Sequence, residues 1–278
     1  MNIRALRLGL LTVLGLARQG FFIPYRYAEN LPAPGDNSPY PAVQNMFAAR
    51  ESDFQDIIEL VETFARDLEA IGTRPPPAPR WEQDWFPRLD AAVLYSLIRH
   101  HQPRRVIEVG SGHSTRFIAQ AVTDGAFLCV ITAIDPAPRA TVAGLDIRFH
   151  KSTIQDSGLL PFESLETGDF LIVDSSHVLM PGSDVDAILN RVLPALPNGV
   201  WIHFHDIFLP EDYPSDWGWR GYNEQSAVAQ LIFGGYGVEF SSHYMTTSML
   251  ASLDSSIVSR LPVLPNACQS SLWLRKAP

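Results

Sequence analysis

Short apolar runs and helical patterns alternate through most of this chain. Runs rich in β-branched and other apolar residues predict buried strands; they cover residues 106–109, 128–134, 147–150, 170–173, 200–205, 237–240 and 271–275. Apolar residues at helical spacing cover 89–100, 184–193 and 224–233. This alternation predicts an α/β fold with a doubly wound, mostly parallel sheet. We expect the last two strands to form an antiparallel edge, with little room for a helix between them.

The first 80 residues follow a different pattern. Residues 53–71 have an apolar face at helical spacing. Residues 20–45 are rich in proline and aromatic residues, which excludes a long helix or a central strand and favours a segment that packs on something. The proline-rich stretch 73–79 marks a boundary. We therefore expect residues 1–80 to form a helical and Pro/aromatic-rich appendage, as a cap or for oligomerisation, and residues 81–278 to form the main domain.

The first twenty residues allow two interpretations. Arg4 and Arg7 precede the apolar residues 8–17, as basic residues precede the core of a signal peptide. That run is short and broken by glycines, and no clear cleavage pattern follows it. Because Leu6 and Leu10 fit one helical face, we prefer an amphipathic helix docked on the body or on a partner chain. No apolar run is long enough to span a bilayer.

Composition narrows the classes of partner. The chain has 278 residues, of which 46% are hydrophobic, and a formal net charge of -9. This charge disfavours binding to nucleic acid through a positive field. The two cysteines, Cys129 and Cys268, form no disulfide framework, so a cytoplasmic location is expected.

The stretch Val106-Ile-Glu-Val-Gly-Ser-Gly-His-Ser-Thr115 combines a buried strand, a glycine turn and a helix start. Gly110 and Gly112 allow positive φ and a close approach of a ligand to the backbone. Ser114 or Thr115 is expected to cap the helix. Thr115 stands where the dinucleotide motif has its third glycine, and the lysine of a P-loop is missing. The turn therefore predicts a nucleoside ligand without a pyrophosphate.

Polar residues end four of the predicted strands. They are Glu108, Asp135, Asp174 and the pair His205-Asp206. The carboxyl ends of parallel strands share one rim of the sheet, where open α/β sheets bind ligands. Asp135 lies about twenty residues beyond the glycine turn, at a position from which a carboxylate binds ribose hydroxyls.

The ordered series of these motifs resembles the class I S-adenosylmethionine-dependent methyltransferases. The series consists of residues 106–112, Ile134-Asp135, Gln155-Asp156, 170–174 and the late strand pair. Asp174-Ser-Ser-His177 and His203-Phe-His-Asp206 look most like the bacterial methyltransferase family 24 subgroup. The resemblance covers about residues 81–278 and implies a seven-stranded Rossmann-like sheet with an antiparallel last strand.

The resemblance also implies a cofactor, S-adenosyl-L-methionine, and residues that bind it. These are Glu108, Gly110, Ser111, Gly112, Asp135, Gln155, Asp156 and Asp174. The glycine turn would contact the methionine part, with Glu108 beneath it, and Asp135 would bind the ribose. Gln155 and Asp156 would lie at the adenine, although their residue types fit ordinary loop surface equally well.

Histidines on the acceptor side of the rim suggest the chemistry. Methyl transfer to a hydroxyl needs a base, or a metal that lowers the pKa of the hydroxyl. His177 or His205, with Asp206, is our preferred catalytic set, because histidine titrates near neutral pH. His203 alternates with His205 on one face of its strand, so we expect it at the substrate.

A divalent metal is the second interpretation of this rim, ranked below a metal-free base. Metal-dependent O-methyltransferases, which the chain resembles here, have ligands at the ends of the same two strands. Asp174, His205 and Asp206 would be the ligands in this chain. A histidine replaces the expected first acidic residue of the pair, which argues against magnesium and suits zinc, iron or manganese.

Residues 209–225 form a long loop that leaves the same rim. Its aromatic and proline residues are typical of a lid or substrate wall. Trp217, Trp219 and Tyr222 are expected to shape an acceptor pocket, and Arg220 to pair with a carboxylate or phosphate of the acceptor. Packing of this loop against residues 20–45 is an equally good interpretation.

The sequence thus predicts an S-adenosylmethionine-dependent methyltransferase that acts on a small molecule or peptide, at oxygen, with a histidine base. One alternative is a metal-dependent hydroxylase, lyase or O-methyltransferase that uses Asp174, His205 and Asp206. Another is a non-catalytic cofactor-binding scaffold that assembles through its N-terminal segment. Residues 1–45 are expected to support a homo-oligomer. A nicotinamide dehydrogenase fits less well, because the glycine pattern departs from the dinucleotide motif.

Overall fold

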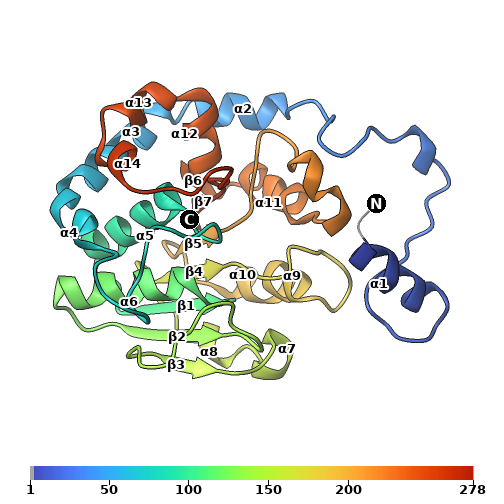
Figure 1. The fold of residues 1–278 in the computed structure, drawn as a ribbon, viewed down its shortest axis with the longest axis horizontal. Helices are drawn as coiled ribbons and strands as arrows, with labels where there is room; N and C mark the ends of the chain where they lie inside the picture. Colours follow the sequence, from blue (N-terminus) through green and yellow to red (C-terminus); the bar gives the residue numbers. More distant parts are fainter. Residues whose placement is uncertain (1–2, 278) are drawn as a thin grey trace.

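Seven strands form a single sheet in the order β3-β2-β1-β4-β5-β7-β6 (Figure 1). The structure is a computed structural model, and it describes residues 3–277. The strands are β1 (Arg105–Val109), β2 (Val130–Ile134), β3 (Arg148–His150), β4 (Phe170–Val173), β5 (Trp201–Phe204), β6 (Gly237–Ser241) and β7 (Leu272–Arg275). Strands β1 to β5 run parallel, while β7 lies antiparallel between β5 and β6. The predicted Rossmann-like sheet with an antiparallel last strand is confirmed.

Helices cover both sides of this sheet (Figure 1). Those before β3 are α1 (Ile3–Val13), α2 (Pro41–Ala48), α3 (Glu51–Thr63), α4 (Ala65–Ala70), α5 (Arg88–His101) and α6 (His113–Gly125). Those between β3 and β5 are α7 (Ile154–Ser157), α8 (Leu160–Glu163), α9 (Asp184–Ala187), the π-helix η2 (Ile188–Val192) and α10 (Leu193–Ala195). After β5 come the 3-10 helix η3 (Ser215–Arg220) and α11 (Glu224–Phe233), then α12 (Ser242–Ser248), α13 (Leu250–Asp254) and α14 (Ile257–Arg260).

Two sequence predictions differ from these elements. The expectation of little room for a helix between the last two strands is wrong, because α12, α13 and α14 all lie between β6 and β7. Antiparallel neighbours do not have to be joined by a hairpin, so adjacency in the sheet says nothing about the length of the connection. The single helix expected over 53–71 is two helices, which meet at Phe64, where φ is -104° and ψ is 15°.

Helices α2 to α4 share one hydrophobic core with the sheet. Phe54 of α3 makes edge-to-face contacts with Phe47 of α2, Phe240 of β6 and Tyr244 of α12. Contacts of this kind bury large aromatic surfaces and fix the position of α3 on the sheet edge. The domain boundary expected at residue 80 stays a prediction. The segment that projects from the packed body is residues 3–32, which we call the arm.

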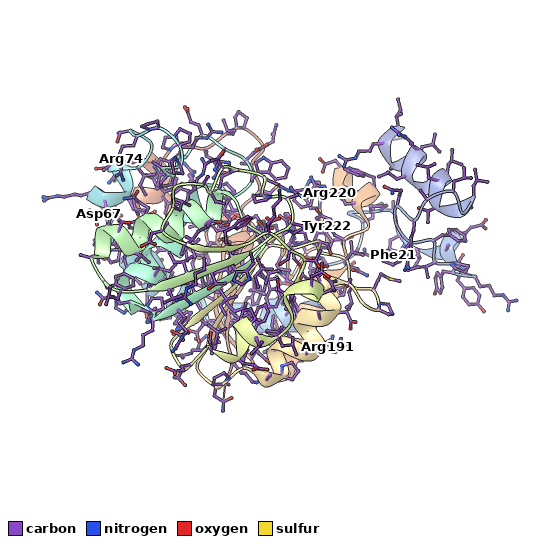
Figure 2. The ribbon with its side chains drawn as sticks, turned by 90° about the horizontal axis from the view of Figure 1, so that it is seen from below. Phe21, Asp67, Arg74, Arg191, Arg220 and Tyr222 are labelled. Atoms are coloured by element: carbon purple, nitrogen blue, oxygen red, sulfur yellow. The ribbon has the colours of Figure 1, made fainter. Side chains whose placement is uncertain are left out.

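The arm extends away from the body (Figures 1 and 2). None of the residues of α1 is buried, and the large apolar side chains that follow it, such as Phe21 and Phe22, are exposed. Of the two expected positions for α1, docking on the body of its own chain is therefore not observed, and docking on a partner chain stays a prediction. No helix within residues 3–277 is long and apolar enough to cross a membrane.

A buried carboxyl group supports the turn between β1 and α6. Glu108 is fully buried at the end of β1 and accepts hydrogen bonds from the hydroxyls of Ser114 and Thr115. The N-cap of α6 is Gly112, whose N–H donates to Thr115 Oγ1 at 2.9 Å. The expected capping role is thus limited to this bond from Gly112 to Thr115, because the Ser114 hydroxyl points back to Glu108 instead.

Burial raises the pKa of Glu108 to about 8, although the two hydroxyl donors act in the opposite direction. The folded-state pKa therefore lies above that of an unfolded glutamate. The associated stability is complete below the ordinary glutamate pKa and is lost as the pH rises to about 8.

We predict that Glu108→Gln changes the pH dependence of unfolding. Glutamine keeps the shape but has no proton to lose, so the variant should gain stability relative to wild type as the pH rises from 5.5 to 7.5. The expected gain is about 2 kcal/mol, from a slope of roughly 1.4 kcal/mol per pH unit. Urea unfolding at both pH values measures it. The exposed control Glu163→Gln should show no such gain, and parallel curves for Glu108→Gln and wild type would contradict the prediction.

Candidate functional site

The glycine turn passes very close to the end of the neighbouring strand. Gly110 has a φ of +83°, and a Cβ added to it would lie 1.8 Å from the carbonyl oxygen of Asp174. Only glycine fits this position, because a side chain would collide with backbone. The turn therefore brings Gly110, Ser111 and Gly112 against the carboxyl end of β4.

Asp135, at the end of β2, holds this turn in place. Its carboxylate accepts hydrogen bonds from the N–H of Ser111 at 2.7 Å and from the Ser111 hydroxyl at 3.0 Å. The N–H of Ala137 donates to its other oxygen at 2.7 Å. A carboxylate has about four acceptor positions, so one remains for a ligand hydroxyl.

A cavity of about 1060 Å³ opens above these strand ends. A typical ligand site has about 300–1,000 Å³, so this one has room for a nucleoside ligand together with an acceptor. The predicted site residues that line it are Gly110, Ser111, Gly112, Asp135, Gln155, Asp174, His177, His205, Asp206, Trp217, Arg220 and Tyr222. The cavity therefore brings together the two groups of residues that the sequence assigned to cofactor and acceptor.

Four predicted site residues do not line the cavity. Glu108 lies beneath the turn. Asp156 is exposed and bonds Thr153 at the start of α7. Trp219 lies outside, with 47% of its surface exposed. His203 is fully buried with Nε2 2.8 Å from Ser271 Oγ, and burial lowers its pKa to about 3, which makes it a neutral core residue rather than a substrate contact.

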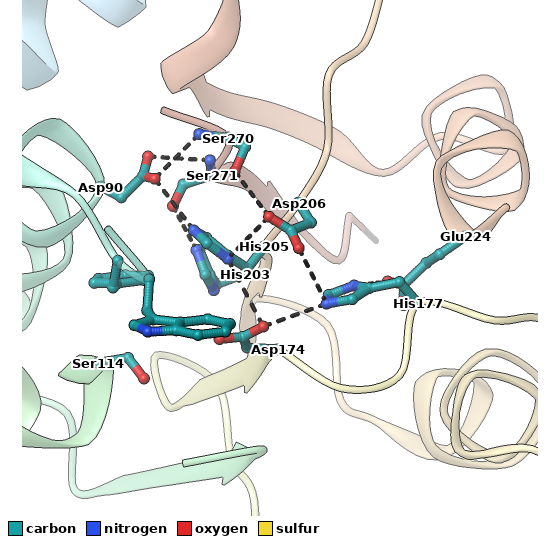
Figure 3. Close-up of polar contacts among 12 residues, drawn as sticks. Asp90, Ser114, Asp174, His177, His203, His205, Asp206, Glu224, Ser270 and Ser271 are labelled. Carbon is teal, nitrogen blue, oxygen red and sulfur yellow. Dashed lines mark hydrogen bonds and ion pairs between the residues drawn. The ribbon is translucent and has the colours of Figure 1, made fainter. Parts of the chain in front are cut away.

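His177 presents one ring nitrogen to the acceptor side of the cavity. Its Nδ1 lies 2.9 Å from the buried carboxylate of Glu224, the first residue of α11. Its Nε2 lies 3.4 Å from Asp174 and 3.4 Å from Asp206, which is longer than a good hydrogen bond (Figure 3). Glu224 thus fixes the ring, while Nε2 faces two carboxylates at the ends of β4 and β5.

His205 mirrors this arrangement on the other side of the same carboxylates. Its Nε2 lies 3.2 Å from Asp90, a fully buried residue of α5, and its Nδ1 lies 3.7 Å from Asp174 and 3.5 Å from Asp206. Asp90 also accepts the backbone N–H groups of Ser270 and Ser271 (Figure 3). We call Asp174, His177, His205 and Asp206 the His/Asp cluster.

Two residues of the His/Asp cluster have unusual backbone conformations. His177 has a φ of +58° and Asp206 a φ of +55°, in the left-handed region that residues other than glycine seldom adopt. Such conformations cost free energy and persist where the surrounding structure holds them. Here they turn both side chains back over the sheet rim toward Asp174.

Carboxylates keep both buried imidazoles of this cluster positively charged. Burial lowers the pKa of His177, but the hydrogen bonds to Asp174 and Glu224 outweigh it and raise that pKa well above its usual range. The pKa of His205 is raised in the same way against the effect of burial, chiefly by the charges of Asp174 and Asp206. His177 is therefore a strong base that holds its proton at neutral pH.

The imidazole and carboxylate groups of the His/Asp cluster are of the types that bind metals, so their geometry tests the interpretation of the rim as a divalent metal site. Within residues 3–277, no group of three or more His, Cys, Asp or Glu side chains is arranged to hold a metal ion. The imidazole nitrogens and carboxylate oxygens of the cluster instead lie within ion-pair distance of one another. A metal at Asp174, His205 and Asp206 stays a prediction without support from this geometry.

The loop after β5 forms the far wall of the cavity and is fastened to the base of the arm. The carboxylate of Asp212 accepts hydrogen bonds from the N–H of Gly35 and the amide of Asn37, and the N–H of Tyr40 donates to Pro210. A Cβ on Gly218 would lie 2.5 Å from Pro34. Both interpretations of the loop are thus partly met: it lines the cavity and packs against part of residues 20–45.

Sequence reasoning missed Asp90 and Glu224. Each orients a histidine of the His/Asp cluster from a helix distant in sequence. Asp90 was visible as an acidic residue within an otherwise apolar helical pattern, and a buried carboxylate requires a partner. Glu224 stands at a helix start, where an acidic residue is unremarkable in sequence.

Comparisons with known proteins agree with this geometry. Residues 107–207 match a protein-family model described as a methyltransferase domain, Methyltransf_24. No curated protein matches the chain. The family match spans the glycine turn, Asp135, Asp174 and the His/Asp cluster, and it favours neither the hydroxylase or lyase nor the scaffold alternative.

Several solved structures are similar in shape. The SAH-bound methyltransferase PaMTH1 of Podospora anserina is 15% identical, with a TM-score of 0.44 over 93% of this chain and 100% of its own. The O-methyltransferase from Bacillus cereus in complex with SAH is 12% identical, with a TM-score of 0.41 over 80% and 91%. The plantazolicin methyltransferase BpumL in complex with SAH is 14% identical, with a TM-score of 0.42 over 84% and 100%. Identities this low carry no residue roles across.

The family match and the sheet order lead to one assignment. The seven-stranded sheet with an antiparallel β7 is the one that the resemblance to class I methyltransferases implies. Residues 107–207 thus match a methyltransferase domain, as the resemblance to S-adenosylmethionine-dependent methyltransferases implies.

Proposed function

We propose that the protein methylates a hydroxyl group of a small molecule or peptide, with His177 as the general base. The observation that carries this proposal is the position of His177 Nε2. His177 lines the cavity, and its Nε2 lies 3.4 Å from each of two carboxylates, while Nδ1 is held 2.9 Å from Glu224. A base needs a fixed ring and one free nitrogen that faces the acceptor.

The residues of the glycine turn fit the proposed cofactor pose. S-adenosylmethionine supplies an electrophilic sulfonium methyl group when bound. Gly110 and Gly112 leave the backbone open to the methionine part, and Asp135 keeps acceptor capacity for a ribose hydroxyl. Gln155 lines the cavity near these residues, whereas Asp156 faces solvent, so we assign the adenine contact to Gln155 alone.

The proposed reaction is a single displacement. The reactive form of His177 is the neutral imidazole, whose population grows as the pH rises, and its Nε2 would take the proton of the acceptor hydroxyl. The freed oxygen lone pair would form a bond to the methyl carbon that the bound cofactor supplies, while the carbon–sulfur bond breaks and leaves a thioether. Asp174, Asp206 and Glu224 stabilise the imidazolium that results. Positioning of the acceptor oxygen in line with that bond supplies most of the acceleration.

The arm supports the proposal of a homo-oligomer. Residues 3–32 contain four arginines and one glutamate, a formal charge of +3, while the whole chain has a formal net charge of -9, so the rest of the chain has a formal charge of -12. The arm also exposes a run of large apolar side chains, among them Leu10 and Phe22. An apolar, cationic segment complements the acidic body of a second copy, whereas that body would be repelled by an anionic membrane.

Composition supports two further parts of the proposal. The acidic net charge argues against a nucleic-acid acceptor. Both cysteines are free thiols, which is compatible with the reducing cytoplasm.

The cofactor assignment predicts that the protein binds S-adenosylhomocysteine and that Asp135→Asn weakens this binding. The variant loses an acceptor for the ribose and for Ser111, so we expect the Kd to rise about tenfold or more, as for a lost charged hydrogen bond. Isothermal titration calorimetry measures both proteins, with the exposed Asp254→Asn as control. Wild type that does not bind at millimolar ligand, or a variant that binds equally well, would refute the assignment.

The base assignment predicts a titration of His177 that depends on Glu224. The hydrogen bond and charge of Glu224 raise the pKa of His177, so Glu224→Gln should lower that pKa. NMR titration of ¹³C-labelled histidine, with the signal assigned by its loss in His177→Gln, measures it without an acceptor. The limb of the pH–rate profile that rises with pH should move to lower pH by the same amount.

A matched control exists for this test. Glu211→Gln breaks a similar pair with His243, 3.0 Å apart and outside the cavity, and should leave the His177 titration in place. An unchanged titration in Glu224→Gln would contradict the base assignment. So would activity that is lost on treatment with a chelator and restored by a divalent metal, which would assign the His/Asp cluster to a metal.

The arm predicts a concentration-dependent dimer. Light scattering after gel filtration should show wild type as a dimer at tens of micromolar, and the double variant Leu10→Ser with Phe22→Ser as a monomer. Leu128→Ser, which removes an apolar side chain with 96% of its surface exposed on the body, is the control and should stay dimeric. Monomeric wild type that co-sediments with anionic lipid vesicles would reject the dimer in favour of a membrane partner.

A further inference from the structure

Arg220 lies on the cavity wall among three aromatic rings. Its guanidinium carbon is 3.9 Å from the centre of the Trp217 ring, 5.4 Å from that of Tyr222 and 6.0 Å from that of Trp219. Arg220 and Tyr222 lie side by side next to the cavity, whereas Arg191 lies elsewhere on the surface (Figure 2). The rings hold a cation in place by stacking on its face, which leaves the edge of the guanidinium available for hydrogen bonds.

That edge lacks partners. Arg220 Nε is shielded from water and has no hydrogen-bond partner, and Nη1 reaches only the hydroxyl of Tyr222 at 3.4 Å. Among residues 3–277, no carboxylate forms an ion pair with Arg220 within 4.0 Å. A shielded donor without a partner is rare in folded proteins and calls for a specific explanation.

Six acidic residues line the cavity, and four of them contact other groups. Among residues 3–277, neither of the other two, Asp84 and Asp216, forms an ion pair with Arg220 within 4.0 Å. Asp135 accepts from Ser111 and Ala137, and Asp174 and Asp206 face the two histidines. Asp184 accepts from the backbone and hydroxyl of Ser176. None of these groups is paired with Arg220, so the guanidinium has its charge available for a ligand.

On the proposed function, we infer that Arg220 binds a carboxylate of the methyl acceptor, and that the acceptor is a hydroxy-carboxylic acid. A guanidinium pairs with a carboxylate through two parallel hydrogen bonds in one plane, and the terminal Nη atoms of Arg220 supply such a pair of donors. The flat faces of Trp217 and Tyr222 fit an aromatic or planar apolar scaffold between the two polar groups.

The wall also sets the spacing between those polar groups. The Tyr222 ring packs against His177, with ring centres 4.7 Å apart, while the Tyr222 hydroxyl reaches Arg220. A single tyrosine side chain thus bridges the base and the guanidinium. An acceptor that contacts both would have its hydroxyl and its carboxylate at opposite ends of a spacer about one aromatic ring long.

The loop that carries Arg220 is held in this position before any acceptor binds. Hydrogen bonds from Gly35 and Asn37 to Asp212, and the contact of Pro34 with Gly218, fasten it from the base of the arm. A binding group that is already ordered loses less entropy when the ligand binds.

The cofactor has a carboxylate as well, so the experiment separates the two sources. Wild type loaded with S-adenosylhomocysteine is titrated by calorimetry with 4-hydroxybenzoate, and in parallel with its methyl ester and with phenyl phosphate. We expect the acid to bind, and the ester and the phosphate to bind at least about tenfold more weakly. The variants are Arg220→Met and Arg220→Lys, with Arg191→Met as a control that removes one cation from the surface.

The Arg220 variants should bind the acid more weakly than wild type does. Arg220→Met should raise the Kd of 4-hydroxybenzoate about 10- to 100-fold, as expected for the loss of charged hydrogen bonds. The Kd of S-adenosylhomocysteine should stay unchanged. Arg220→Lys should recover part of the loss, because it restores charge without the planar fork. Methyl transfer from S-adenosylmethionine to the acid, followed by mass spectrometry, should give a product heavier by one methylene.

Three outcomes would overturn the inference. In the first, Arg220→Met weakens the binding of S-adenosylhomocysteine and not that of the acid, which would assign Arg220 to the cofactor. In the second, the ester or the phosphate binds as well as the acid. In the third, no acid binds at 10 mM to protein that binds S-adenosylhomocysteine normally. Failure to bind S-adenosylhomocysteine at all would instead refute the proposed function, so the two failures are distinguishable.

Discussion

Two buried imidazoles held between carboxyl groups are the feature on which the rest of this site depends. His177 and His205 each lie against a fully buried carboxyl group, Glu224 or Asp90, and face Asp174 and Asp206 with the other nitrogen. A buried charge needs compensation, so neither the histidines nor the carboxylates would be tolerated at this depth alone. The cluster therefore couples α5, β4, β5 and α11 through electrostatics.

That coupling explains why the surrounding backbone is unusual. His177 and Asp206 adopt left-handed conformations that place both side chains over the rim, and Gly110 gives up a side chain so that the cofactor turn can touch Asp174. Asp174 thus belongs to both halves of the cavity, through its backbone on one side and its carboxylate on the other. The cluster has more carboxyl groups than imidazoles, so its negative charge also attracts the positive sulfonium of the proposed cofactor. The same carboxyl groups would therefore stabilise both the methyl donor and the protonated base.

The cofactor half of the site was largely predictable from the sequence, because it depends on local order. A buried strand, a glycine turn and an aspartate at a strand end each have a local sequence pattern that can be recognised. The parallel sheet then places the carboxyl ends of its strands on one rim. His203 shows the limit of this logic. It shares a strand face with His205, but β5 ends at Phe204, so His205 reaches the rim while His203 stays in the core against Ser271.

The acceptor half was less predictable, because its geometry comes from contacts between segments distant in sequence. Asp212 and Gly218 are positioned by residues 34–37, and Glu224 orients His177 across 47 positions. The segment that fastens the acceptor wall is continuous with the arm that we assign to a second copy. Residues 34–37 contact the loop that carries Trp217 and Arg220, and Tyr222 of the same loop packs against His177. We therefore assign the methyl donor to elements of the central sheet, and the acceptor to a wall that contacts residues 34–37.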